Sequence, residues 1–215
     1  MKIGVFDSGK GGRSVALAIE KNLPDLEVIF RDDAEHLPYG TKQPTELYGY
    51  VLPILQSLVD DGCAVIVIAC NTVSTTLIAS LRNQVKVPLI PVEPMVEAAA
   101  RLTQSGVIAV CATPGTLASD RYHELKRKYA KELTVLEPDC GDWALMIERN
   151  ELDVQIIDQR LRPVMVQGAD VIVLGCTHYH WIESEIKQIA NGRARVIQPE
   201  ESIVRRLRQV LALLP

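Results

Sequence analysis

The chain has 215 residues, of which 47% are hydrophobic and 23% are charged, as in an ordinary soluble globular protein. This length is enough for one large domain or for two smaller ones. The net charge of −4 argues against a nucleic-acid-binding protein, which usually presents a basic face.

The N-terminus and the apolar runs predict a cytoplasmic protein. The chain begins with the apolar segment MKIGVFD, which is too short for the core of a signal peptide. No apolar run approaches the ~20 residues that span a bilayer, so we expect no membrane partner. Five cysteines without the spacing of a disulfide framework are typical of free thiols in a reducing compartment.

Short apolar runs alternate along the chain with segments of helical periodicity, which predicts an α/β fold with largely parallel sheets. We expect strands at residues 2–6, 27–31, 64–69, 87–92, 106–111, 133–138, 170–175 and 194–199. We expect helices at residues 12–22, 44–60, 73–83, 94–103, 116–130, 142–149, 153–167, 180–190 and 200–212.

The two series of strands look like one unit written twice, 106 residues apart. Gly62 and Cys70 map onto Gly168 and Cys176, and Asp7-Ser8-Gly9 maps onto Thr113-Pro114-Gly115. The alternative is that all buried parallel strands resemble one another. We predict two similar domains, each a mainly parallel sheet flanked by helices, at residues 1–95 and 96–205. We expect the last helix, about residues 206–215, to be able to pack back on the first domain.

Polar side chains follow the predicted strands, and ligands of open parallel sheets bind beyond the carboxyl ends of strands. Cys70 and Cys176 each stand at such an end, before a helix whose free N–H groups stabilise anions and lower the pKa of a thiol. Facing domains would bring both thiols to one cleft. The strand-end residues are Asp7-Ser8, Asp32-Asp33, Cys70-Asn71-Thr72, Thr113 and Cys176-Thr177-His178.

Two thiols on opposite walls of a cleft suit the inversion of a carbon that carries an acidic hydrogen. One thiolate removes the proton from one face, and the other group, as a thiol, delivers a proton to the opposite face. Asp7 and His178 stand beside the two sulfurs as assistants, and Glu148 is a third candidate from the second domain. The alternatives are that Asp7 is a turn residue, that His178 caps a helix and that Glu148 is a solvated helix residue.

These residues resemble the cofactor-independent glutamate racemases of bacteria, within the aspartate/glutamate racemase superfamily. The segments that carry the resemblance are VFDSGKGG (5–12), LPYGTK (37–42), ACNT (69–72), DCGDWALMIERNEL (139–152) and GCTHY (175–179).

The resemblance implies that Cys70 and Cys176 are the acid–base pair and that Asp7, His178 and Glu148 support them. It implies no pyridoxal phosphate and no metal, and a role in supplying D-glutamate for peptidoglycan. The partner is then a small molecule, glutamate, without nucleic acid, and a homodimer is an open alternative. The residues that it places around the substrate are Asp7, Ser8, Pro38, Tyr39, Gly40, Asn71, Thr72, Thr177 and His178.

The chain departs from this family at a few positions. Lys10 and Arg13 stand where aliphatic residues are usual, and we expect Lys10 to reach the cleft entrance and alter the grip on the substrate. His180 and Trp181 stand where a proline and an aliphatic residue are common. Cys63 and Cys111 are expected to be buried structural residues.

Three other functions compete with glutamate racemisation. An aspartate or other amino-acid racemase would differ only in pocket size and carboxylate reach. A nucleotide-binding module is suggested by GKGG after the first strand, but neither the G-x-G-x-x-G pattern nor a P-loop is present. A zinc or redox protein would use Cys70, Cys176 and His178, although their spacing is irregular and no C-x-x-C occurs.

Overall fold

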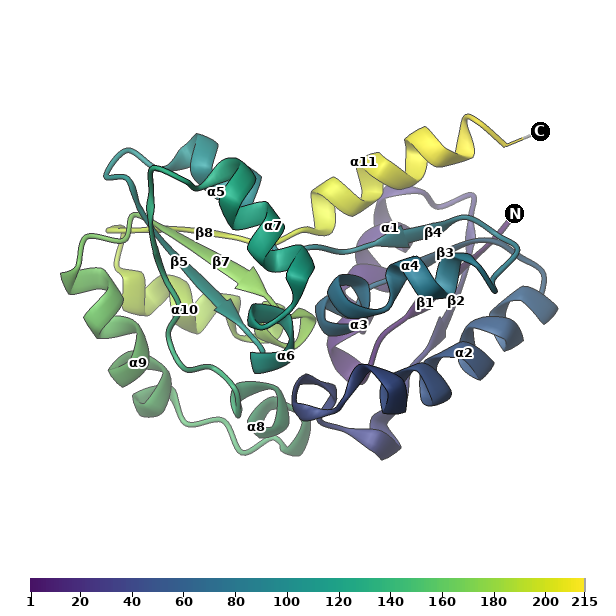
Figure 1. Cartoon of the computed structure of the whole chain (residues 1–215), viewed down its shortest axis with the longest axis horizontal. Helices are drawn as coiled ribbons and strands as arrows, with labels where there is room; N and C mark the ends of the chain where they lie inside the picture. The colour runs from purple at the N-terminus through teal and green to yellow at the C-terminus, as the bar shows by residue number, and fades with distance from the viewer. Residues whose placement is uncertain (215) are drawn as a thin grey trace.

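Two four-stranded parallel sheets form the framework of the protein in a computed structural model that describes residues 1–214 (Figure 1). The first sheet has the strand order β2-β1-β3-β4 and the second has the order β6-β5-β7-β8. Strands about 106 residues apart in the sequence therefore occupy equivalent positions in the two sheets. Every expected strand is present: β1 (Lys2–Phe6), β2 (Glu27–Arg31), β3 (Cys63–Ile68), β4 (Leu89–Pro91), β5 (Val107–Ala112), β6 (Thr134–Leu136), β7 (Val171–Gly175) and β8 (Arg195–Ile197).

Helices cover both faces of each sheet, so the two-domain α/β fold expected from the sequence is confirmed. The longest helix, at residues 44–60, begins and ends where the sequence predicts. The α-helices are α1 (Arg13–Asn22), α2 (Pro44–Asp60), α3 (Asn71–Thr76), α4 (Ile78–Arg82), α5 (Val96–Leu102), α6 (Pro114–Leu117), α7 (Asp120–Tyr129), α8 (Trp143–Arg149), α9 (Val154–Val166), α10 (Glu183–Ala190) and α11 (Glu200–Leu211). Short 3-10 helices are η1 (Lys10–Gly12), η2 (Ala34–His36), η3 (Tyr39–Thr41) and η4 (Thr177–Ile182).

Three predicted helices are divided in the structure. The helix expected at 73–83 is α3 followed by α4, because the hydroxyls of Thr75 and Thr76 bond to carbonyls one turn back and compete with the helical ladder. The helix expected at 116–130 divides at Ser119, whose side chain caps α7. The helix expected from residue 180 begins as η4 directly after Cys176 and becomes α10 at Glu183.

The central strands are buried on both faces, which explains their nearly continuous apolar sequences. In β3 and β7, every residue is buried except one half-buried alanine. β-branched side chains dominate both strands because they pack well on a pleated surface. Their carboxyl ends are therefore held rigidly. Cys176 follows the end of β7 directly, and Cys70 follows the end of β3 after Ala69.

The last helix packs back on the N-terminal half of the chain. Ile203, Val204 and Leu207 of α11 are buried with side chains of β1, β3 and α1, and both termini lie on the same side of the molecule (Figure 1). The packing segment begins at Glu200, earlier than the 206–215 expected, and Pro215 lies outside the described residues. We propose that residues 1–95 form one domain and that the second domain, expected at residues 96–205, ends before α11, which returns to the first.

No helix among residues 1–214 is long and apolar enough to cross a membrane. Among the same residues, no three His, Cys, Asp or Glu side chains are grouped in a way that would hold a metal ion. Cys63 and Cys111 are buried thiols, as expected, and Cys140 is buried with them in the cores.

Candidate active site

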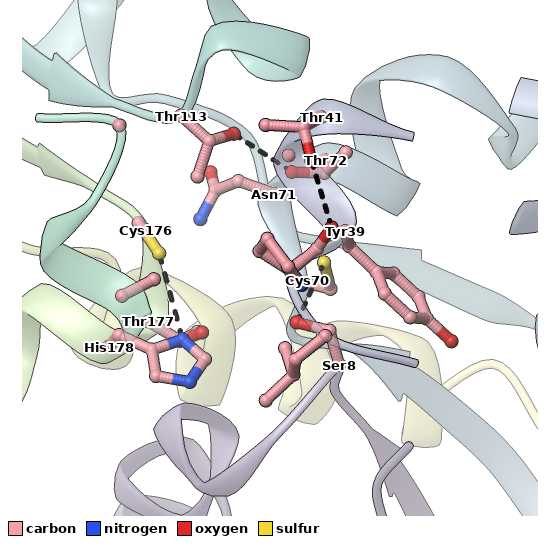
Figure 2. A pocket seen from close by; sticks show the side chains of 15 residues that line it. Ser8, Tyr39, Thr41, Cys70, Asn71, Thr72, Thr113, Cys176, Thr177 and His178 are labelled. Atoms are coloured by element: carbon pink, nitrogen blue, oxygen red, sulfur yellow. Dashed lines mark hydrogen bonds between the residues drawn. The ribbon is translucent and has the colours of Figure 1, made fainter. Parts of the chain in front are cut away.

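The ends of β1 and β3 face the end of β7 across a narrow pocket with a cavity volume of ≈ 20 Å³. Figure 2 shows Cys70 and Ser8 on one side of this pocket, with Cys176 and His178 on the other. Two thiols from sequence-distant halves therefore reach one enclosed space. The predicted residues that line it are Ser8, Pro38, Tyr39, Gly40, Cys70, Asn71, Thr72, Cys176, Thr177 and His178.

Cys70 follows β3 and occupies the N-cap position of α3. Its Sγ lies 3.7 Å from Oγ of Ser8, and the amide of Val73 also points at the sulfur. Burial, reinforced by the nearby Asp7 carboxylate, raises the pKa of Cys70 to about 12. The expectation that the helix N-terminus lowers this pKa is therefore wrong for Cys70, because desolvation of the thiolate outweighs the attraction of one short helix. Cys70 is a thiol at neutral pH.

Cys176 has a different electrostatic environment, which His178 and Glu148 provide. Nδ1 of His178 lies 3.8 Å from Sγ of Cys176, and Nε2 of the same ring lies 2.8 Å from Oε1 of Glu148. Burial by itself would lower the pKa of His178, but these two partners raise it to about 10. The ring is then an imidazolium at neutral pH, and its positive charge lies beside the sulfur of Cys176.

The two sulfurs thus differ in their electrostatic surroundings, although the sequence presents them symmetrically. Cys70 lies beside a carboxylate and holds its proton, whereas Cys176 lies beside a cation. Two thiols with unlike neighbours consequently face one pocket from opposite sides. This arrangement is what proton removal from one face of a carbon and proton delivery to the other requires.

Asp7 is fully buried at the end of β1 and is not among the residues that line the pocket. Its carboxylate accepts a hydrogen bond from the amide of Gly12 at 2.8 Å and from the hydroxyl of Thr177 at 3.1 Å. Burial raises the pKa of Asp7, although His178 and the hydrogen bonds act in the opposite direction. Asp7 therefore joins the two halves beneath the pocket and acts on Cys70 through its charge. Glu148 also lies outside the lining and reaches the pocket only through His178.

Asn71 is buried in the pocket wall with neither its amide nitrogen nor its amide oxygen hydrogen-bonded. Buried amides are almost always paired, because an unpaired one costs ~1–3 kcal/mol. Figure 2 shows its side chain directed into the space between the halves. The unpaired donor and acceptor are therefore suited to a polar ligand in the pocket.

A hydroxyl pair closes the pocket opposite His178. Oγ1 of Thr72 lies 2.9 Å from Oγ1 of Thr113 (Figure 2). Oγ1 of Thr113 also hydrogen-bonds to Thr116 at 3.0 Å. Thr72 belongs to α3, and Thr113 follows β5 and caps α6, so this contact joins the two halves beside the thiols.

The segment at residues 37–41 lines the pocket from a third side. Tyr39 presents its ring to the pocket wall, but its hydroxyl donates to Asp33 at 2.6 Å and points away, as Figure 2 shows. Asp33 also holds His36 at 2.7 Å. A Cβ on Gly40 would lie 2.6 Å from Cβ of Thr113, so glycine is required for this close approach. The ring of Tyr39 therefore shapes the pocket wall, and its hydroxyl anchors the loop to Asp33 and does not face the pocket.

Five lining residues were not assigned to the site by the sequence analysis, and three of them come from the second half of the chain. The 106-residue offset maps Asp7 onto Thr113, and this correspondence was a signal that Thr113 would reach the site. Gly141 and Ala144 approach through α8, whose docking depends on packing between elements and leaves no local signal in the sequence. The added lining residues are Leu37, Thr41, Thr113, Gly141 and Ala144.

The chain was compared with protein families and with curated proteins. The family described as Asp/Glu/Hydantoin racemase matches residues 13–207. A glutamate racemase of Ralstonia nicotianae is 38% identical over 98% of this chain and 77% of its own length. A glutamate racemase of Pseudomonas aeruginosa is 34% identical over 98% of this chain and 81% of its own length.

Solved structures give the same result. Glutamate racemase of Escherichia coli, solved with L-glutamate and the activator UDP-MurNAc-Ala, superposes with a TM-score of 0.92 at 31% identity. That comparison covers 99% of this chain and 82% of the other. Glutamate racemase of Francisella tularensis, solved with D-glutamate, has a TM-score of 0.82 at 28% identity and covers 98% of this chain and 81% of the other.

Proposed function

Because the chain belongs to the Asp/Glu/hydantoin racemase family, we propose that it interconverts L-glutamate and D-glutamate by proton transfer at Cα between Cys70 and Cys176. The observation that carries this proposal is the entry of both thiols, from opposite halves, into one pocket. The curated relatives and the two solved structures described above are glutamate racemases, and such enzymes are isomerases.

The reaction needs one base and one acid on opposite faces of the α-carbon. In one direction the Cys176 thiolate takes the α-proton, and the electrons of the broken C–H bond move into the adjacent carboxylate. The Cys70 thiol then donates its proton to the opposite face. Cys176 ends as a thiol and Cys70 as a thiolate, so the reverse reaction begins from the other sulfur.

The supporting groups act on the two proton carriers. The imidazolium of His178 lies beside the sulfur that takes up the proton, and Glu148 maintains the charge of His178. The burial of Cys70 and the negative charge of Asp7 keep the proton on the Cys70 sulfur. These roles explain how two chemically identical side chains perform opposite functions in one turnover.

Two kinds of group in the pocket wall hold the carboxylates of the substrate. One is an amide without a hydrogen-bond partner in the protein, and the other is a set of hydroxyls that can donate hydrogen bonds. Asn71 has both amide atoms free, and Ser8, Thr72 and Thr177 add hydroxyls around the two thiols. Pro38, Tyr39 and Gly40 form the third wall and limit the length of the ligand. The product D-glutamate would serve peptidoglycan synthesis.

The five cysteines are free thiols, which suits a reducing compartment, and we propose the cytoplasm as the location. The homodimer and the absence of nucleic-acid binding stay predictions.

Incubation with L-glutamate or L-aspartate in deuterated water tests this function. We expect loss of optical activity and uptake of α-deuterium with glutamate and a much slower reaction with aspartate. Faster turnover of aspartate would assign the sister activity, and the absence of both reactions would reject the racemase proposal.

A further inference from the structure

Lys10 connects the two halves at a point outside the pocket. It begins η1, in the N-terminal half, and its side chain extends to the C-terminal end of α8 in the other half. Nζ donates to the carbonyl of Glu148 at 2.9 Å and to Oδ1 of Asn150 at 3.2 Å. We propose that Lys10 is a positioning residue that clamps the end of α8 and thereby fixes Glu148 against His178.

The clamp has a backbone part and a side-chain part. The amide of Lys10 donates to Oε1 of Glu148 at 2.6 Å, and its ammonium also lies 3.9 Å from Oε2 of that carboxylate. The ammonium meets the carbonyls at a helix C-terminus, where a cation is favoured by the helix dipole. Only the ammonium depends on the identity of residue 10, so a substitution there isolates its contribution.

The contacts form a continuous chain from Lys10 to the sulfur of Cys176. Oε1 of Glu148 accepts from the amide of Lys10 and lies 2.8 Å from Nε2 of His178. Nδ1 of the same imidazole lies 3.8 Å from the sulfur. A displaced Glu148 would release the ring, and the charge that favours the thiolate would lose its orientation.

The glycines around Lys10 support a close and specific contact. A Cβ on Gly9 would lie 2.2 Å from Oε1 of Glu148. The turn that carries Lys10 therefore fits directly against the Glu148–His178 pair, and its backbone is already adapted to this position. Trp181 adds a hydrogen bond from Nε1 to the carbonyl of Gly11 at 3.2 Å.

The ammonium does not act on the substrate directly. Lys10 is absent from the lining of the pocket, and its three polar contacts are to Glu148 and Asn150. The expectation that Lys10 grips the substrate at the cleft entrance therefore gives way to a different role, in which it acts through Glu148.

Four charged or titratable groups face the Glu148–His178 pair from the elements packed around it. They are Lys10 from η1, Asp32 after β2, Asp7 after β1 and Cys176 after β7. Burial opposes ionisation of Glu148, but His178 and Lys10 together hold its pKa below the ordinary value. Loss of the ammonium should raise that pKa, so the carboxylate would be protonated at a higher pH.

This inference rests on the proposed racemase activity, and Lys10→Met tests it. We expect kcat for glutamate to fall about tenfold with KM changed by less than about twofold, because the substrate pocket is intact while the Glu148–His178 pair is loosened. We expect the acidic limb of the kcat profile to move to higher pH. Lys10→Arg, which keeps the cation, should recover most of the activity and the original profile.

Two further variants separate the clamp from a general loss of structure. Asn150→Gly removes one acceptor while suiting the left-handed backbone at this position (φ 56°), and its effect should vanish in the Lys10→Met background. Lys187→Met removes a lysine that pairs with Glu183 within α10, and it should behave as wild type.

Hydrogen exchange provides a readout that does not depend on turnover. Amides at the end of α8 should exchange faster in Lys10→Met than in the wild type or in Lys187→Met. If Lys10→Met exchanges its α8 amides at the wild-type rate, or keeps the wild-type kcat and pH profile, the positioning role of Lys10 is wrong. A raised KM with an unchanged kcat would instead show that Lys10 acts on the substrate at the cleft entrance. If the wild-type protein does not racemise glutamate, the proposed function is rejected. The hydrogen exchange of the α8 amides in Lys10→Met would still test whether Lys10 holds the end of α8.

Discussion

Nδ1 of His178 lies 3.8 Å from Sγ of Cys176, two residues before it in the chain. Cys176 is in extended conformation and η4 begins at Thr177, which turns the imidazole back toward the sulfur. Cys70 has Ser8 as its neighbour in place of an imidazole. The two thiols are therefore chemically inequivalent before any substrate binds.

Replacement of either thiol should abolish racemisation. Cys70→Ala removes one proton carrier and Cys176→Ala the other, so each variant should lose at least about 10³-fold in kcat in both directions, in the range typical of a general acid or base. Polarimetry with purified L- and D-glutamate measures this. Cys63→Ala, which removes a buried thiol outside the pocket, is the matched control. Racemisation at the wild-type rate by either site variant would refute the assignment.

Glu148→Gln should shift the alkaline limb of the activity profile to lower pH. Glu148 helps to raise the pKa of His178 to about 10, so without the carboxylate the imidazolium loses its proton at a lower pH. We expect kcat near pH 9 to fall more than kcat near pH 7, by about tenfold against about threefold. Stopped assays across this pH range measure the difference.

The neighbouring Glu151, which is exposed, offers the control for that experiment. Glu151→Gln should leave the profile unchanged. An alkaline limb that stays in place in Glu148→Gln would show that Glu148 does not maintain the charge of His178.

Asn71→Ala should stabilise the free protein and weaken substrate binding. Both amide atoms of Asn71 are buried without partners, so its removal relieves a cost of about 1–3 kcal/mol, offset in part by the lost packing. We expect an unchanged or higher melting temperature together with a KM raised about tenfold or more. A lower melting temperature with an unchanged KM would show that Asn71 is structural.

Gly11→Ala should impair activity by disturbing the close contact between Gly11 and His178, which joins the two halves of the chain. The added Cβ would lie 2.6 Å from the backbone nitrogen of His178 and 2.7 Å from its Nδ1, so η1 or the imidazole must move. We expect kcat to fall and the free energy of unfolding to decrease by about 1–3 kcal/mol, as for other overpacked contacts. Gly49→Ala, in an open and exposed position of α2, should instead add about 0.5–1 kcal/mol. Denaturant titrations measure both free energies of unfolding. Equal effects of the two substitutions would contradict a tight contact between Gly11 and His178.

The sequence by itself determined the strands, their parallel pairing and the position of both thiols at strand ends. This succeeded because buried parallel strands require continuous β-branched runs, and such runs are visible locally, as in AVIVIA before Cys70 and DVIVLG before Cys176. The duplicated spacing then indicated two halves, and it pointed to residues that meet between them.

Only the tertiary structure decided the charge state of each site and the partners of its charged groups. The elevated pKa of Cys70 depends on complete burial beside Asp7, and the contacts of Glu148 with His178 and Lys10 join residues 30 and 138 positions away. Desolvation and long-range electrostatics depend on distances in the folded protein, which residue spacing does not encode. The sequence therefore placed the two sulfurs, and the packing of the two halves gave one a buried carboxylate and the other an imidazolium as its neighbour.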